Sequence, residues 1–329
     1  MSPPCVLVTG GAGYIGSHAV LALQDAGYAA VVIDDLSTGA RSAVPQGVPF
    51  HHGDIADRAL VPRLLSDHAV EAVMHFAGSI AVGESVQAPL TYYRNNVAGS
   101  LALIESCIEA GVGRFIFSSS AAVYGVPAVL PVDEDALIAP INPYGATKAM
   151  TERMLADAAV ALPAFRPVCL RYFNVAGADP QGRAGQQGPQ STHLIRAAVE
   201  AALGHREHLE IYGRDYDTRD GTCERDYLHV TDLAEAHVAA LRYLEGGGAA
   251  SALNCGYGQG FTVLEVIAAV EAVIGRPLPV RASPRRPGDP PRLVASGDKI
   301  RQVLGWTPAH SNLHDMIQSA LAWQAKIGG

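Results

Sequence analysis

Positive charge is scarce in this sequence, and only three of its 329 residues are lysines. Lysine and arginine together number 24 against 32 aspartates and glutamates, which gives a formal net charge of -8 at pH 7. A positive surface field is what draws a protein to nucleic acid or to anionic lipid. We therefore expect neither nucleic acid nor a membrane among its partners.

Cysteine and long apolar runs are also scarce. The five cysteines stand far apart and form no C-x-x-C pair, a spacing that favours neither a disulfide framework nor a zinc site. The longest uncharged run, residues 115–132, is interrupted by serine, glycine and proline, so it predicts no transmembrane helix. The first five residues include no basic side chain and predict no secretory leader. Together these features favour a cytoplasmic protein without a resident metal.

Apolar residues, by contrast, make up 49% of the chain, enough for a large core. Short apolar runs alternate with helical patterns through the first half, which is typical of a buried parallel sheet with crossover helices. We predict an α/β fold with a doubly wound parallel sheet of the Rossmann type. Its six strands are expected at residues 5–10, 29–35, 48–54, 70–78, 114–120 and 168–174. The helices between them are expected at 14–26, 57–67, 91–110 and 144–162.

The composition changes after residue 174, where glycine, alanine, glutamine, aspartate and proline form a loop that extends to residue 188. This change predicts a first domain of residues 1–174 and a smaller C-terminal substrate-binding domain of residues 175–329. Part of 226–248 is expected to pack back on the first domain. Helices of the second domain are expected at 191–203, 230–244, 262–275 and 313–327.

A glycine-rich segment, Thr9–Gly16, follows the first predicted strand and opens the first predicted helix. Glycines permit the tight turn and let the backbone approach a pyrophosphate, whose charge the N–H groups at the helix start stabilise. An unliganded turn is the alternative. The position between strand and helix favours a dinucleotide site, and its expected contacts are Gly10, Gly13, Tyr14, Ile15 and Gly16.

The second predicted strand leads to Asp34, which lies 18 residues beyond Gly16. A carboxylate at this place accepts a hydrogen bond from the ribose 2′-hydroxyl and would repel a 2′-phosphate. No basic residue that could neutralise a phosphate follows before Arg41. The sequence therefore predicts NAD rather than NADP, with a simple loop cap as the alternative role of this aspartate.

Tyr144 and Lys148 are four residues apart on a predicted helix, so their side chains share one face. A phenol with a pKa of about 10 is a poor base, but an adjacent ammonium and a positive nicotinamide ring both favour the phenolate. Ser120, at the end of the fifth predicted strand, is placed to bridge a substrate oxygen to this base. These three are the predicted catalytic residues.

Taken together, the motifs resemble the extended short-chain dehydrogenase/reductase superfamily, and within it the nucleotide-sugar 4-epimerases. The resemblance implies that Tyr144 takes the proton of the sugar 4-hydroxyl, that a 4-keto sugar forms, and that tightly held NAD is regenerated in each turnover. The implied activity is reversible C4 epimerisation of UDP-glucose and UDP-galactose. The segments that carry the resemblance further are 53–55, 75–78, 82–86, 92–97, 117–125, 171–174, 225–227 and 285–289.

The same resemblance implies further contacts and a homodimer joined through the predicted helices at 91–110 and 144–162. The implied cofactor contacts are Tyr144, Lys148, Asp54, Ile55, Phe76, Ala77, Asn95 and Ser118. The implied UDP-sugar contacts are Ser120, Tyr144, Asn174, His193, Leu194, Arg225, Arg286 and Asp289.

Three positions bear on which UDP-sugar is used. Ile80 stands where many members have a lysine, which removes one pyrophosphate contact, and His193 stands where an asparagine is expected. Leu293 lies at the position that helps to decide whether an N-acetyl group fits, and its bulk favours sugars without one. A UDP-pentose, a UDP-uronate or a UDP-N-acetylhexosamine remains an alternative substrate.

Other reactions are less favoured. Ala121 and Ala122 occupy the place where similar 4,6-dehydratases have an Asp-Glu pair, so the acid that elimination requires is missing. A non-catalytic NAD sensor on the same fold is a further class, against which the presence of Tyr144, Lys148 and Ser120 argues. The histidines at 205 and 208 do not form an H-E-x-x-H motif, which disfavours a metal hydrolase.

Overall fold

The computed structural model describes residues 3–188, 193–286 and 288–328. Its centre is a seven-stranded sheet in the order β10-β6-β5-β4-β1-β2-β3, and every neighbouring pair is parallel. The six predicted strands are all present. The seventh strand, β10, was missed because it lies beyond residue 174, in the part of the chain assigned to the second domain. The bounds are β1 (Cys5–Thr9), β2 (Ala29–Asp34), β3 (Phe50–His52), β4 (Val70–His75), β5 (Arg114–Ser120), β6 (Arg166–Tyr172) and β10 (Ser251–Cys255).

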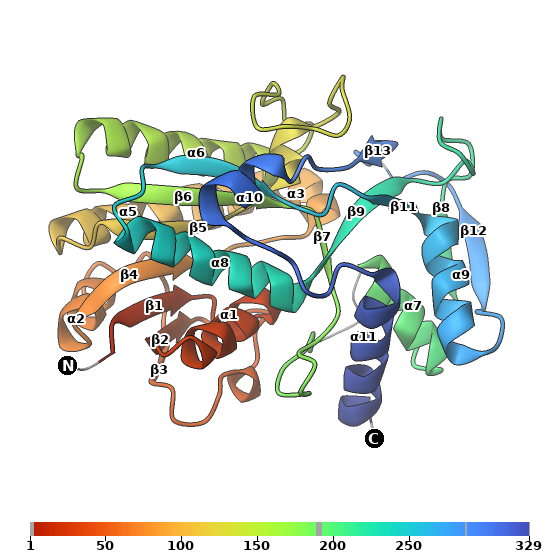
Figure 1. Cartoon of the computed structure of the whole chain (residues 1–329), viewed down its shortest axis with the longest axis horizontal. Helices are drawn as coiled ribbons and strands as arrows, with labels where there is room; N and C mark the ends of the chain where they lie inside the picture. The colour runs from red at the N-terminus through yellow and green to blue at the C-terminus, as the bar shows by residue number, and fades with distance from the viewer. Residues whose placement is uncertain (1–2, 189–192, 287, 329) are drawn as a thin grey trace.

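Helices cover both faces of this sheet, because alternate strand residues point to opposite sides (Figure 1). Val6 and Val8 of β1 belong to a core cluster shared with α1 (Tyr14–Asp25) and α8 (Val230–Glu245). Leu7 belongs to the cluster on the other face, covered by α2 (Leu60–Asp67), α5 (Gly99–Glu109) and α6 (Pro143–Ala161). Full burial of each such side chain stabilises the fold by about 1.5–3 kcal/mol. The doubly wound α/β prediction is confirmed.

Segments between these elements shape the edge of the sheet where the strands end. The turn η1 (Arg41–Ala43) follows β2, and the turn η3 (Ala121–Tyr124) follows β5. Between β4 and α5 the chain forms α3 (Val82–Gln87), α4 (Pro89–Tyr92) and the π-helical segment η2 (Tyr93–Ala98). The single helix predicted over 91–110 is thus broken near its start.

In the part of the chain that the structure describes, two smaller sheets and the helices α7, α9 and α11 form the other region of the molecule (Figure 1). One sheet has the order β11-β9-β13 with β7 also paired to β9, and the other pairs β8 with β12. Its strands are β7 (Asn174–Ala176), β8 (Leu209–Tyr212), β9 (Glu224–His229), β11 (Gly260–Thr262), β12 (Val280–Ser283) and β13 (Arg292–Leu293). A third core cluster lies among α7 (Leu194–Ala202), α9 (Val263–Ile274) and α11 (Leu313–Gly328).

The two regions are interleaved along the chain. After the second region has begun at β7, the chain returns to the first sheet with α8, which packs against α1, and with β10. The helix α10 (Asp298–Leu304) also packs against α8 and β10. The helix predicted over 191–203 begins at Leu194 in the structure, and residues 191 and 192 lie outside the described residues.

Several features of the described residues bear on the sequence expectations. No helix in them is long and apolar enough to cross a membrane. All five cysteines are free thiols, and four of them are buried. The ranges 3–188, 193–286 and 288–328 contain no group of three or more histidines, cysteines and acidic residues placed to hold a metal ion.

Candidate functional site

The glycine loop lies between β1 and α1, at the edge where the parallel strands end. Gly10 adopts a φ of +69°, and a Cβ there would lie 2.6 Å from the backbone nitrogen of Ala77, just beyond β4. A Cβ on Gly16 would overlap the Gly10 carbonyl oxygen. The helix α1 starts without a side-chain cap, so the N–H groups of its first turn have no helical acceptor. This bare backbone cradle suits the pyrophosphate of a dinucleotide.

Asp34, the last residue of β2, is anchored beside this loop. Its Oδ2 accepts a hydrogen bond from the Ala12 N–H at 2.9 Å, and its Oδ1 accepts one from the Leu36 N–H at 2.8 Å. Burial raises the pKa of this carboxyl, and the two N–H groups act in the opposite direction. Each carboxylate oxygen can accept more than one hydrogen bond, so a ribose hydroxyl can still bind here.

Two predicted cofactor residues use their side chains elsewhere. The Tyr14 hydroxyl donates to the Gly177 carbonyl oxygen at 2.6 Å, which ties α1 to the segment after β7. The Phe76 ring packs against His237 of α8, with 4.7 Å between the ring centroids. For both residues the backbone is the part that remains for a cofactor.

The segments after β3 and β4 hold the remaining predicted cofactor contacts. Asp54 is exposed, and its Oδ1 accepts the Ala56 N–H at 2.9 Å. Ile55 is buried near α5. Asn95 is exposed and donates to the Ser79 hydroxyl at 3.1 Å.

The neighbouring Asn96, which sequence reasoning missed, is buried and holds the Ser79 backbone twice. Its Oδ1 accepts the Ser79 N–H at 2.8 Å, and its Nδ2 donates to the Ser79 carbonyl oxygen at 3.0 Å. The same Nδ2 reaches the Thr147 hydroxyl on α6 at 3.0 Å. Asn96 therefore joins the segment after β4 to the helix that carries Tyr144.

Tyr144, Lys148 and Ser120 meet at the end of β5. Asn142 caps α6 by accepting the Gly145 N–H at 2.8 Å, and Pro143 occupies the first turn, so the helix begins just before Tyr144. Tyr144 is 8% exposed and Lys148 is 4% exposed. The Lys148 Nζ donates to the carbonyl oxygen of Ser118 at 2.8 Å and lies 5.9 Å from the Tyr144 ring centroid. The Ser120 hydroxyl accepts the Ala122 N–H at 3.2 Å and acts on the Tyr144 phenol by lowering its pKa.

The electrostatics of this set differ from the sequence expectation. Burial raises the pKa of the Tyr144 phenol, and the hydrogen bond with Ser120 opposes this shift. Burial also lowers the pKa of Lys148 to about 8. Desolvation disfavours both charged forms, and the ammonium does not outweigh it. A phenolate near pH 7 therefore requires a further positive charge beside it, such as an oxidised nicotinamide ring.

The predicted nucleotide-sugar residues lie mainly on the sheet built around β9. Asn174 on β7 is paired in register with Tyr227, and Leu293 on β13 is paired with Arg225. An ion pair of 3.8 Å joins the Arg225 guanidinium to Asp289, so two predicted contacts come together. A cation beside a polar carboxylate suits a phosphate and a ribose hydroxyl.

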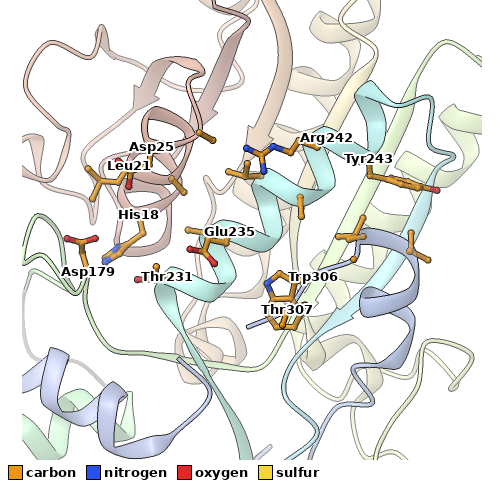
Figure 2. Close-up of a pocket in the computed structure, with 18 of the residues that line it drawn as sticks. His18, Leu21, Asp25, Asp179, Thr231, Glu235, Arg242, Tyr243, Trp306 and Thr307 are labelled. Atoms are coloured by element: carbon orange, nitrogen blue, oxygen red, sulfur yellow. The ribbon is translucent and has the colours of Figure 1, made fainter. Parts of the chain in front are cut away.

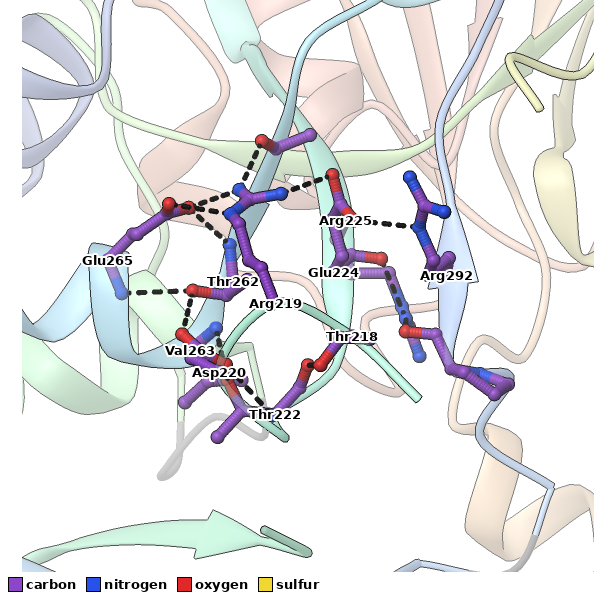
Figure 3. Close-up of polar contacts among 12 residues, drawn as sticks. Thr218, Arg219, Asp220, Thr222, Glu224, Arg225, Thr262, Val263, Glu265 and Arg292 are labelled. Atoms are coloured by element: carbon purple, nitrogen blue, oxygen red, sulfur yellow. Dashed lines mark hydrogen bonds and ion pairs between the residues drawn. The ribbon is translucent and has the colours of Figure 1, made fainter. Parts of the chain in front are cut away.

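A set of ion pairs holds β9 in place (Figure 3). The two carboxylate oxygens of Glu224 bind Arg219 and Arg292, each at 2.8 Å. Arg219 also forms an ion pair with Glu265, which belongs to the capping box at the start of α9. These contacts fix the strand residue that precedes Arg225, whose Nη1 donates to the Glu224 carbonyl oxygen at 2.9 Å.

The two neighbouring arginines 285 and 286 have different surroundings. Arg285 forms an ion pair with Asp215 at 2.8 Å and lies over the Tyr216 ring. Arg286 is half-buried, with its guanidinium carbon 3.8 Å from the centroid of the Tyr212 ring. The Tyr212 ring orients the Arg286 guanidinium without neutralising its charge, and a phosphate contact needs that charge.

His193 and Leu194 stand at the start of α7. His193 is the N-cap residue, and its Nδ1 lies 3.1 Å from the Gln186 amide nitrogen. Leu194 is half-buried against the core cluster around α7. Ile80 is 57% exposed, so the residue that replaces the expected lysine has no extensive packing of its own.

One cavity of about 650 Å³ lies elsewhere, between α1, α8 and residues 303–307 (Figure 2). His18 and Asp25 of α1, Glu235 and Arg242 of α8, and Trp306 are among its lining residues. It contains none of the predicted site residues. This cavity is therefore separate from the candidate site, which consists of the glycine loop and the side chains described above.

Comparison with known proteins decides the family. Residues 6–256 match the model of the NAD dependent epimerase/dehydratase family. The chain belongs to this family. It is 57% identical over 324 residues to a UDP-glucose 4-epimerase of Azospirillum brasilense, covering 98% of this chain and 93% of that protein. It is 49% identical over 321 residues to a UDP-glucose 4-epimerase of Rhizobium meliloti, covering 98% and 97%.

Solved structures of the family show the same architecture. A UDP-glucose 4-epimerase of Brucella ovis in complex with NAD superposes with a TM-score of 0.93 at 48% identity, covering 97% of this chain and 98% of that one. A UDP-glucose-4-epimerase of Stenotrophomonas maltophila with bound NAD and formylated UDP-arabinopyranose gives a TM-score of 0.95 at 40% identity, covering 99% of both chains. NAD is the cofactor of the family, and the glycine cradle and Asp34 of this chain fit it.

Proposed function

We propose that this protein is an NAD-dependent UDP-sugar 4-epimerase that interconverts UDP-glucose and UDP-galactose. The observation that carries the proposal is the meeting of the buried Tyr144 and Lys148 with the half-buried Ser120 at the end of β5, on the same sheet edge as the glycine cradle. The relatives that match nearly the whole chain are named for this reaction, which supports the same assignment here.

The chain's own residues move the proton. Tyr144 accepts the proton of the sugar 4-hydroxyl and later returns one to the same oxygen, and Ser120 passes it between them. Lys148 stabilises the phenolate by its positive charge, and its hydrogen bond to the Ser118 carbonyl holds the ammonium in place. Bound NAD supplies a reversible two-electron acceptor, which no side chain provides. We assign its pyrophosphate to the backbone of Gly10, Gly13, Tyr14, Ile15 and Gly16, its ribose to Asp34, and further contacts to Asp54, Ile55, Phe76, Ala77, Asn95 and Ser118.

Epimerisation requires that C4 be approached from both faces, so the sugar must turn while the nucleotide stays bound. We assign the grip on the diphosphate to Arg225 and Arg286 and the ribose contact to Asp289. Asn174, His193 and Leu194 complete the proposed substrate site. Because these residues bind the UDP part, the hexose is free to turn beside Tyr144.

Substrate choice depends on residues around the sugar. Leu293 is buried with Tyr124 and Phe173 in one apolar cluster. We assign its side chain to the position that limits the space for an N-acetyl group. This favours hexoses without an N-acetyl group. UDP-galactose should therefore be converted faster than UDP-N-acetylgalactosamine.

The direct test is to incubate the purified protein with UDP-galactose, without added NAD, and to measure UDP-glucose. Parallel incubations with a UDP-pentose, a UDP-uronate and UDP-N-acetylgalactosamine rank the substrates. Conversion of one of these but of neither hexose would keep the mechanism and overturn the substrate assignment. Bound NAD without conversion of any UDP-sugar would favour a sensor.

We also propose a cytoplasmic homodimer with an NAD-binding domain of residues 1–174 and a mainly UDP-sugar-binding domain of residues 175–329, part of 226–248 packing on the first. Exposed apolar side chains on the helices expected at the interface support the dimer: Leu101 is 44% and Met150 46% exposed. Sedimentation velocity should give twice the chain mass. The double substitution Leu101→Glu/Met150→Glu should give the mass of one chain, and a dimer of unchanged stability would place the interface elsewhere.

A further inference from the structure

A buried network of charged and polar side chains lies beside the reaction residues, and the function proposed above makes no use of it. Glu152 on α6 and Arg171 on β6 form an ion pair of 2.7 Å, with side chains 10% and 7% exposed. Arg171 also donates to the Tyr124 hydroxyl at 2.8 Å, and that hydroxyl donates to the Asn254 amide oxygen at 2.7 Å. Glu152 accepts a further hydrogen bond from the Ser119 hydroxyl at 2.5 Å.

Glu152 lies next to the catalytic residues, both along its helix and through the residue that it binds. Glu152 follows Lys148 by four residues on α6, so the two side chains share one face of the helix. Ser119, which Glu152 binds, lies between Ser118, whose carbonyl oxygen accepts from Lys148, and Ser120, which bridges to the base. The Glu152 carboxylate therefore holds Ser119, the residue between the two serines that serve the site.

Stability alone is a weak reason for such a pair. Burying two charges is costly, and apolar side chains of similar volume commonly stabilise a fold as well or better. The chain keeps both charges at a place where a negative charge acts on Lys148. This location points to a role in the reaction.

We infer that Glu152, itself held by Arg171, is a positioning residue. Its carboxylate fixes Ser119, the residue before Ser120, and supplies the negative charge that keeps Lys148 an ammonium. The inference deepens the proposed function and rests on it. Two effects follow, one of charge and one of position, and they can be separated by substitution.

The charge effect has a definite sign. Burial lowers the pKa of Lys148 to about 8, and Glu152 acts against this lowering. Burial holds the pKa of His75 on β4 at about 3, raises that of Tyr124 to about 12 and raises those of Cys169 and Tyr172, so these groups are neutral near pH 8. Burial also raises the pKa of Tyr144, which is neutral unless a cofactor charge stands beside it. The network includes one further carboxyl group, that of Glu134, whose Oε1 accepts the Asn254 N–H at 2.7 Å. Arg171 is positive. Removing the Glu152 charge takes away the negative charge that opposes the desolvation of Lys148, so the ammonium is disfavoured.

The scarcity of lysine makes this measurable, because Lys148, Lys299 and Lys326 are the only lysines. In protein labelled with carbon-13 at Cε of lysine, an NMR titration of the purified holoprotein follows each ammonium, and Lys148→Met assigns its signal. In Glu152→Gln the Lys148 midpoint should fall by about one pH unit or more. The control Asp157→Asn removes an exposed carboxylate from the same helix and should leave the midpoint unchanged.

The pH profile of epimerisation supplies a second readout. Because the ammonium is lost at lower pH in Glu152→Gln, the alkaline limb of kcat should move to lower pH by the same amount, with little change in KM. Glu152→Asp keeps the charge but is one methylene too short for Ser119. It should keep the Lys148 midpoint near that of the unmodified protein while kcat falls, and it serves equally if the Gln variant does not fold.

The outcomes are distinguishable. An unchanged Lys148 midpoint in Glu152→Gln, or a midpoint in Glu152→Asp that moves as far as in the Gln variant, would overturn the inference. Failure of the unmodified protein to convert any UDP-sugar would instead count against the proposed function, while the NMR titration would still report on Glu152 and Lys148.

Discussion

The residues proposed for the reaction and those proposed for the nucleotide are held in different ways. Tyr144 and Lys148 are nearly inaccessible and stand on a long helix packed against the main sheet. Arg286 and Asp289, by contrast, are half-buried near the short strand β13, where one aromatic ring and one ion pair support them. The first group is built into a large core, and the second lies on the surface of a smaller one.

The difference follows from what each group has to do. A proton-transfer site works through shifted pKa values, and these arise where water is excluded. A diphosphate is bound by charge and hydrogen-bond geometry, which arginine side chains provide without being fully desolvated. Substitutions in the two regions should therefore change different kinetic parameters.

The largest effect is expected from Tyr144→Phe, which removes the proton acceptor but keeps the ring in its packing. We expect kcat to fall by about 10²–10⁴-fold with KM changed little. Steady-state conversion of UDP-galactose gives both values. Turnover equal to that of the unmodified protein would remove Tyr144 from its assigned role and with it the first half of the comparison.

Gly16→Ala tests the cradle on which cofactor binding is proposed to depend. A Cβ here overlaps the Gly10 carbonyl oxygen, so the loop must move, and we expect a loss of bound NAD together with about 1–3 kcal/mol of folding stability. The absorbance of NAD released on denaturation and the thermal midpoint report the two effects. Gly246→Ala, at a position with ordinary contacts and a negative φ, is the control and should retain NAD.

Arg225→Met probes the nucleotide side. Loss of a charged hydrogen bond of about 1.5–3 kcal/mol should weaken UDP binding by about 10–100-fold while kcat changes little. Calorimetric titration of the holoprotein with UDP measures the change. If kcat fell and the UDP affinity did not change, Arg225 would belong with the reaction residues and not with the nucleotide-binding residues.

The smallest effect is expected from the two neighbouring arginines, Arg285 and Arg286. Arg286→Met should weaken UDP binding by about tenfold, whereas Arg285→Met, which removes an exposed pair with Asp215, should change it by less than about threefold. The same titration compares the two variants side by side. Equal losses in both would mean that the neighbouring arginine also contacts the diphosphate.

Much of the first region could be predicted because its signals are local. The glycines before α1, the aspartate at the end of β2 and the tyrosine–lysine spacing on α6 each follow from backbone conformation or helical periodicity within a short stretch. Asn96 was missed in favour of Asn95 because neighbouring polar residues look alike until one of them is buried. Arg171, a charge next to the buried apolar residues 168–170 of β6, was a signal that could have been used.

The sequence by itself determined the α/β class, the dinucleotide loop and the residue types of the reaction, since each depends on contacts between near neighbours in the chain. Only the tertiary structure decided that β10 completes the sheet, that Glu152 meets Arg171, and that burial raises rather than lowers the pKa of Tyr144. These facts depend on which distant segments exclude water from one another, and desolvation is a property of the packed molecule that no local pattern records.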